Sequence, residues 1–236
     1  MANQLTSLGL LSLLAAGVLP PLVWLWFWLK EDKTRPEPRS LLVLSFFAGA
    51  LSIIIVIPLQ FVARDIIVPG LALLLAWAAI EEIVKYAVAY IADFRKRTYD
   101  EPIDSMIYLI TVALGFAAFE NVLFLVKSAT AGGLSLGITT ALMRFIGATL
   151  LHAFSSAFLG GFIALAFYKS RKMKHLYAIA GLITAVVLHT IFNFFIMNDG
   201  FFGGSINVLS VFAALWIGVI ALLLFFERVK NVTSKI

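Results

Sequence analysis

Two adjacent carboxylates and an ammonium interrupt an apolar run in AAIEEIVKYA, residues 78–87. The three charges are Glu81, Glu82 and Lys85, and three further ionisable residues lie inside other apolar runs: Glu120, His152 and His189. Carboxylates and imidazoles bind metal ions, and they also take up and release protons during catalysis. These residue types therefore predict either a metal centre or a general acid–base centre.

Helical spacing groups some of these residues. Lys85 is four residues after Glu81 and three after Glu82, so one ammonium can hold either carboxylate ionised. His189 and Asn193 are also four residues apart, which projects an imidazole and an amide from one helix face. The spacing leaves open which carboxylate Lys85 contacts.

The elements that must position these residues are membrane helices. The 236-residue chain is 62% hydrophobic, with a mean hydropathy of +1.01. Apolar runs of about 20 residues match the length that crosses a bilayer, and they do not alternate as barrel strands do. We expect an all-α, polytopic membrane helix bundle that forms a single domain over 1–236 in the cell membrane. Its seven transmembrane helices are expected at about 5–29, 41–63, 71–92, 104–126, 139–168, 176–198 and 206–226.

Basic residues predict the orientation. The first, third and fifth connections and the tail hold most of them: Lys30, Lys33, Arg35, Arg39, Arg95, Lys96, Arg97, Lys169, Arg171, Lys172, Lys174, Arg228, Lys230 and Lys235. Because positive connections stay cytoplasmic, the N-terminus is expected outside and the C-terminus in the cytoplasm. These loops are expected to contact the lipid bilayer, not nucleic acid. Gly132–Gly133 and Gly203–Gly204 mark short outer connections, and Arg144 falls near the outer interface, where no interior role is expected for it.

The candidate residues reach a common depth. Glu81, Glu120, His152 and His189 lie 14 to 17 residues from the inner-side markers Arg95, Asp104, Lys169 and Lys174, respectively. At a rise of 1.5 Å per residue, each is ~21–26 Å from the cytoplasmic boundary. A charge at such depth costs roughly 2.5–3.5 kcal/mol. One shared, hydrated site in the outer half of the bilayer explains this better than four separate structural roles.

The ordered motifs resemble those of the PrsW family. They are EEIVK (81–85), GFAAFEN (115–121), LLHAFSSAFLGG (from Leu150) and HTIFN (189–193). The first connection contains RPEP at 35–38, where the family pattern reads EPEP. The resemblance extends from about residue 24 to 195. The PrsW family shares a superfamily with the CAAX prenyl proteases, whose second motif usually ends in His where this chain has Glu120.

The resemblance implies an intramembrane endopeptidase that acts near the outer side of the bilayer on a single-pass membrane protein, similar to an anti-sigma factor. It implies Glu81 and Glu82 as the acidic catalytic pair, completed by His152, His189, Glu120 and Asn193. In the version we favour, Glu120, His152 and His189 bind zinc, Glu81 activates the bound water, and Lys85 and Asn193 assist. In the other, no metal takes part, as in a glutamate protease of the CAAX type: Glu81 and a His activate water directly, and His189 and Asn193 donate hydrogen bonds to the oxyanion.

Two further classes of protein remain open from the residues alone. Buried Glu, Lys and His also occur in transporters and proton relays, although the chain lacks the inverted repeat and paired broken helices typical of them. A noncatalytic binding scaffold is the other class, and the presence of the complete residue set speaks against it.

Overall fold

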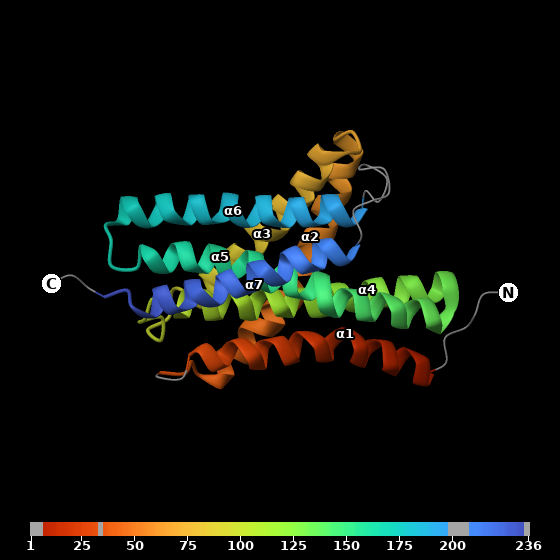
Figure 1. Ribbon diagram of the computed structural model, residues 1–236, viewed down its shortest axis with the longest axis horizontal. Helices are drawn as coiled ribbons and strands as arrows, with labels where there is room; N and C mark the ends of the chain where they lie inside the picture. The colour runs from red at the N-terminus through yellow and green to blue at the C-terminus, as the bar shows by residue number, and fades with distance from the viewer. Residues whose placement is uncertain (1–6, 33–34, 198–207, 234–236) are drawn as a thin grey trace.

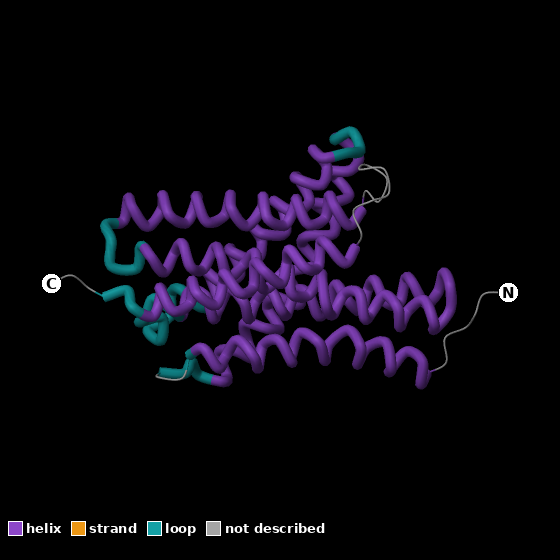
Figure 2. Tube along the Cα trace, in the orientation of Figure 1, coloured by secondary structure: helices purple, strands orange, loops and turns teal. Residues whose placement is uncertain are grey.

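The computed structural model describes residues 7–32, 35–197 and 208–233. These residues form helices joined by short connections, and no strand occurs among them (Figure 2). The helices are α1 (Ser7–Trp28), α2 (Arg39–Ile66), α3 (Leu71–Ala92), α4 (Asp104–Met143), α5 (Thr149–Leu165), α6 (Arg171–Met197) and α7 (Val208–Lys230), with a short 3-10 turn at Leu29–Glu31 after α1 and a π turn at Arg144–Ala148 before α5. The predicted all-α class is confirmed.

Five helical segments of the described chain are long and apolar enough to cross a membrane: Ser7–Glu31, Arg39–Ile66, Asp104–Leu165, Arg171–Phe195 and Phe212–Lys230. Helix α3 is as long as a membrane span, but Glu81, Glu82 and Lys85 place three charged residues in its middle, so it is not among these five segments. The chain is therefore a multi-pass membrane protein. The count of seven spans and the orientation stay predictions.

Helix α4 folds back on itself at two glycines. Gly133 has a φ of 78°, in the left-handed region that favours glycine, and Gly132 is also non-helical. A Cβ on Gly137 would lie 3.1 Å from that of Ala129, so the two arms touch just beyond the turn. Figure 1 shows the chain reversing where the two arms of α4 meet, at the right of the view. The predicted connection at Gly132–Gly133 is confirmed, but the residues on either side are helical and not a loop, because only the glycine pair interrupts the helical backbone. Gly203–Gly204 lies outside the described residues.

The first arm of α4 is the centre of the bundle. Every residue from Asp104 to Ala118 is buried, and α1, α2 and α5 pack around this arm. Glycines bring α2 and α4 into backbone contact: a Cβ on Gly115 would lie 1.9 Å from the carbonyl oxygen of Phe46, and one on Gly49 would lie 2.0 Å from that of Val112. This close crossing fixes the position of Glu120, which follows Gly115 on the same arm.

The remaining helices surround this arm. Figure 1 shows α1, α4, α5, α6 and α7 running along the long axis, while α2 and α3 cross them obliquely. The RPEP segment of the first connection is anchored against α4, because the Tyr108 hydroxyl donates a hydrogen bond to Glu37. The backbone N–H of Glu37 also donates to Asp32 at 3.3 Å. Burial raises the pKa of Asp32 to about 6 and also raises the pKa of Glu37.

Candidate active site

Residues from three helices meet at one buried point. Helix α3 contributes Glu81, α5 contributes His152 and α6 contributes His189, and one oxygen or nitrogen atom of each lies within 4.8 Å of the others. All three side chains are buried. The common depth inferred from the sequence therefore corresponds to a real cluster of these three residues.

Glu81 offers one free oxygen to this cluster. Its Oε1 accepts a hydrogen bond of 2.8 Å from Gln60 on α2, whose backbone carbonyl in turn accepts one of 3.1 Å from Trp77. Its Oε2 is buried and has no hydrogen-bond partner in the described part of the chain. This oxygen lies 3.7 Å from Nε2 of His189 and 3.9 Å from Nδ1 of His152.

Each imidazole is held from behind by a different carboxylate. Nδ1 of His189 lies 2.8 Å from Oε1 of Glu82, and Nε2 of His152 lies 3.0 Å from Oε2 of Glu120. An ionised carboxylate only accepts hydrogen bonds, so the N–H of each ring points to its carboxylate. The other nitrogen of each ring then carries a lone pair on the side of Glu81 Oε2. The two rings are nearly perpendicular, with centroids 5.1 Å apart.

Glu82 is fully buried and bonded on both oxygens. Lys85 donates to its Oε1 at 2.6 Å, Ser155 donates to the same oxygen at 3.0 Å, and Ser156 donates to Oε2 at 3.3 Å. Lys85 therefore pairs with Glu82 and not with Glu81, which answers the question that the spacing left open. Its Nζ also lies 3.1 Å from Nδ1 of His152.

Glu120 has a cationic partner that the sequence reasoning did not assign. Arg144, from the π turn, donates to Glu120 Oε2 and, at 2.6 Å, to Asn121. The expectation that Arg144 has no interior role is therefore wrong, because the second arm of α4 returns it to the level of Glu120. A sequence signal did exist: a cation beside the membrane interior usually pairs with a carboxylate. Gln60 and Ser155 were also missed, and neutral residues of these types give no such signal.

A cavity of about 620 Å³ opens over the cluster. Helices α2 to α6 contribute to its walls. Glu81, Glu120, His152, His189 and Asn193 all line it. Glu82 and Lys85 do not, so of the acidic pair only Glu81 faces the space in which a substrate could bind.

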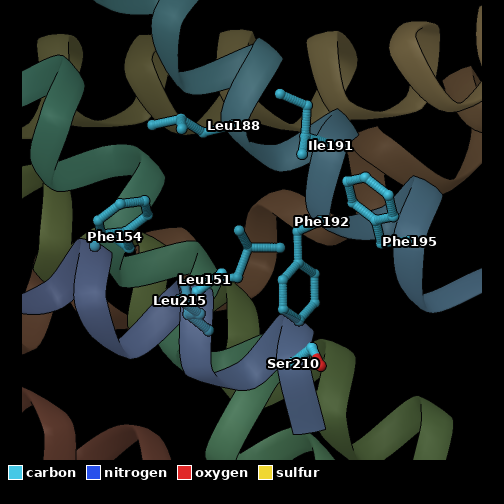
Figure 3. A pocket seen from close by; sticks show the side chains of 10 residues that line it. Leu151, Phe154, Leu188, Ile191, Phe192, Phe195, Ser210 and Leu215 are labelled. Carbon is cyan, nitrogen blue, oxygen red and sulfur yellow. The ribbon is translucent and has the colours of Figure 1, made fainter. Parts of the chain in front are cut away.

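An apolar pocket of about 460 Å³ adjoins this cavity. It lies between α5, α6 and α7, and it shares Leu151 and Phe192 with the cavity. Figure 3 shows Leu151 and Phe192 pointing into the pocket, with Leu215 and Ser210 of α7 on its other side. Apolar side chains can therefore be accommodated directly beside the buried cluster.

The cluster fits a metal ion in its donor chemistry. Two imidazoles and one carboxylate form a known catalytic zinc set that leaves a position open. Glu81 Oε2 is a buried oxygen without a partner among the described residues, and the ring nitrogen of each imidazole that is not bonded to a carboxylate lies within 4 Å of it. Ligands of a tetrahedral zinc are about 3.4 Å apart for bond lengths near 2.05 Å, close to the 3.7 and 3.9 Å found here. The Nδ1 lone pair of His152 also lies near Lys85, whose Nζ is 3.1 Å away. A metal bound at Nδ1 would replace this contact, and Lys85 would still have its ion pair with Glu82.

Fold and site together define a multi-pass membrane protein with a buried carboxylate–imidazole centre that is suited to a metal. The sequence matches the PrsW family of intramembrane metalloproteases over residues 37–224, and the chain belongs to this family. By membership it is an intramembrane protease.

The chain is similar to proteins named Protease PrsW along most of its length. It is 29% identical to Protease PrsW of Geobacillus kaustophilus over 87% of this chain and 88% of that protein. Identity to Protease PrsW of Bacillus subtilis is 24%, over 78% of this chain and 82% of that protein. Identity to Protease PrsW of Clostridioides difficile is 26%, over 80% and 81%. No solved structure gives a significant match.

Proposed function

We propose that this protein is an endopeptidase that hydrolyses a peptide bond of a membrane-spanning substrate near the outer side of the bilayer, assisted by zinc. The observation that carries the proposal is the pair of imidazoles, each held by a carboxylate on one ring nitrogen and facing Glu81 Oε2 with the other. Such carboxylate–histidine pairs fix the tautomer and the orientation of metal-binding imidazoles.

We assign Glu81, His152 and His189 as the residues that hold the metal. When bound there, zinc lowers the pKa of water and polarises the scissile carbonyl. The sequence reasoning gave Glu120 this place and made Glu81 the base. The geometry favours the exchange, because Glu120 lies against Nε2 of His152, on the ring edge away from Glu81.

Glu120 is then the proton acceptor. It is the one carboxylate besides Glu81 among the described residues that line the cavity. Its Oε2 is engaged by Arg144 and His152, which leaves Oε1 to accept the proton of the attacking water, and because Glu120 lies across the His152 ring from Glu81 this transfer runs through one further water in the cavity. Water adds to the carbonyl carbon, the C–N bond breaks, and Glu120 returns the proton to the leaving nitrogen. Asn193, in the cavity wall, can donate a hydrogen bond to the substrate.

Glu82 and Lys85 act on positioning and charge. Glu82 accepts from the N–H of His189 and so holds the lone pair of Nε2 on the side of Glu81. A buried carboxylate without a partner would be costly, and the ammonium of Lys85 at 2.6 Å compensates that charge.

We further propose seven spans, with the N-terminus outside and the C-terminus in the cytoplasm. In Figure 1 the α3–α4 and α5–α6 connections and the end of α7 lie at the same end of the molecule as the end of α1. The described basic residues of the first, third and fifth connections and of the tail belong to these segments, in keeping with positive loops on the cytoplasmic side. The apolar pocket beside the cavity supports a substrate that arrives from the bilayer with apolar side chains.

The test is cleavage of a single-span peptide by the purified protein in liposomes. We expect cleavage to be lost in Glu81→Gln, His152→Ala and His189→Ala. Glu227→Gln and His175→Ala are matched controls, because both are exposed and neither lines the cavity. Retained cleavage in Glu81→Gln, or proton flux without any cleavage, would contradict the assignment. Proton flux alone would instead support a relay.

A further inference from the structure

We propose that Arg64 and Lys127, at the rim of the cavity, bind acidic residues of the substrate two or three positions from the scissile bond. The inference rests on the proposed protease function and adds the class of sequence that the site prefers. It begins with the distribution of the basic residues.

Three basic residues line the cavity: Arg64 at the end of α2, Lys127 on the first arm of α4 and Arg144 after the second arm. The chain has 18 Lys and Arg residues. Fourteen belong to the connections and tail that predict the cytoplasmic side, and Lys85 pairs with Glu82 inside the bundle. The remaining three are these cavity residues. Topology does not explain cations on the outer side, so their gathering around one cavity calls for another reason.

The three cations differ in how they are used. Arg144 is only 13% exposed and is committed to Glu120 and Asn121. The Arg64 side chain is 55% exposed, and its neighbour Asp65, at 3.5 Å, is itself 69% exposed. Lys127 is exposed, and within the described part of the chain its ammonium has no carboxylate at ion-pair distance. Arg64 and Lys127 are therefore free to bind an incoming anion.

The charge balance of the cavity favours an anionic ligand at its rim. Two carboxylates line the cavity, Glu81 and Glu120, and Arg144 already compensates Glu120. Glu81 lies at the floor, where the proposed metal offsets its charge. The two rim cations are left without partners inside the cavity, so an acidic side chain at the rim meets net positive charge.

The helix positions set the distance from the reacting atoms. Arg64 is one turn beyond Gln60, which binds Glu81, so it lies about 6 Å further along α2. Lys127 is seven residues beyond Glu120, about 10 Å along α4. An extended peptide covers about 3.3–3.6 Å per residue, and these distances correspond to two or three residues. Anionic lipid could also meet the rim, but both cations share walls with the catalytic carboxylates, which favours the peptide.

The experiment compares matched single-span peptides. A Glu pair is moved residue by residue along the flank that is expected outside, and each peptide has a Gln counterpart. Exposed ion pairs contribute about 0.2–1 kcal/mol each, which corresponds to about 1.4- to 5-fold per pair. We therefore expect kcat/KM to favour the best Glu peptide about threefold to tenfold, and added salt to shrink this preference.

Charge reversal makes the test specific. Arg64→Glu/Lys127→Glu should lose the preference for Glu peptides and gain one for matched Lys peptides. Arg228→Glu, which changes an exposed basic residue that does not line the cavity, should leave the preference unchanged. Zinc affinity should be the same in all variants, which shows that the site itself is intact.

Each outcome decides the matter. Equal cleavage of Glu and Gln peptides by the unaltered protein would overturn the inference and leave the protease function standing. A rim-variant defect that appears in phosphatidylcholine vesicles containing phosphatidylglycerol, and is absent without that lipid, would assign the rim to lipid. If no peptide is cleaved at all, the protease function fails and the inference falls with it.

Discussion

The assignment of Glu81, rather than Glu120, as the metal-binding carboxylate predicts an ordered series of zinc affinities. In this assignment Glu120 contacts His152 at Nε2, 3.0 Å away, and does not itself hold the metal. Loss of such an outer partner weakens metal binding about 10- to 100-fold, or about 1.4–2.8 kcal/mol. Glu120→Gln keeps an oxygen that accepts from Nε2–H, so we expect about tenfold. Glu120→Ala removes that oxygen, so we expect the upper end of the range.

Removal of a direct ligand should cost more. Glu81→Gln replaces with a neutral amide the carboxylate whose Oε2 lies near both imidazoles. We expect its loss of affinity to match that of His189→Ala and to exceed that of Glu120→Ala. The assay is competition for zinc against a chromophoric chelator, with the purified protein in detergent. It does not depend on catalysis, and His175→Ala and Glu227→Gln provide the baseline.

The alternative assignment predicts a different order of zinc affinities. If Glu120 is the third ligand and Glu81 the base, Glu120→Gln will weaken zinc binding as much as His189→Ala does. Glu81→Gln will then bind zinc nearly as well as the unaltered protein and will only lose activity. That result would refute the reasoning from ring edges, and the sequence-based assignment would be restored.

Three other predictions follow from the packing. Gly115→Ala places a Cβ 1.9 Å from the Phe46 carbonyl oxygen, whereas an ordinary contact is about 3.3 Å. We therefore expect the variant to be destabilised by about 3 kcal/mol or more, measured as a lower Tm in detergent. An unchanged Tm would contradict the close crossing of α2 and α4. Burial raises the pKa of Asp93 from 3.8 to about 6, although a hydrogen bond from Ser45 and the charge of Lys96 oppose this rise. The folded state therefore binds the Asp93 proton more tightly than the unfolded chain, and the stability that this proton contributes is lost as pH rises from about 4 to 6. Asp93→Asn should raise Tm at pH 8 but not at pH 4. Ala214→Trp should fill the apolar pocket and reduce cleavage of a single-span peptide without changing zinc affinity, and an unchanged cleavage rate would separate the pocket from substrate binding.

The helical class and the convergence of residues could be predicted because both follow from strong constraints. Backbone groups in lipid must be satisfied within a helix, so long apolar runs leave little choice of structure. Charges at bilayer depth are costly, so their common depth indicated a shared site. In the structure Glu81, His152 and His189 do come together.

Rotation about each helix could not be predicted in the same way. Depth follows from counting residues, but the contact between Lys85 and Glu82 depends on side-chain rotamers and on Ser155 of another helix. The reversal at Gly133 brings Arg144 back to Glu120, a contact between residues 24 apart that residue spacing does not encode. Gln60 is neutral, so no charge in the sequence indicates its hydrogen bond to Glu81.

The adjacent glutamates of EEIVK have distinct positions because consecutive residues on an α-helix point about 100° apart. Glu81 faces the cavity, while Glu82 is buried and does not line it. Their oxygens nevertheless reach the two nitrogens of the same ring, since Glu82 contacts His189 at Nδ1 and Glu81 lies 3.7 Å from Nε2. One carboxylate therefore orients the imidazole that the other meets across the proposed metal. Lys85, one turn further, compensates the charge of the fully buried Glu82, which explains why three charged residues occur together in an apolar helix.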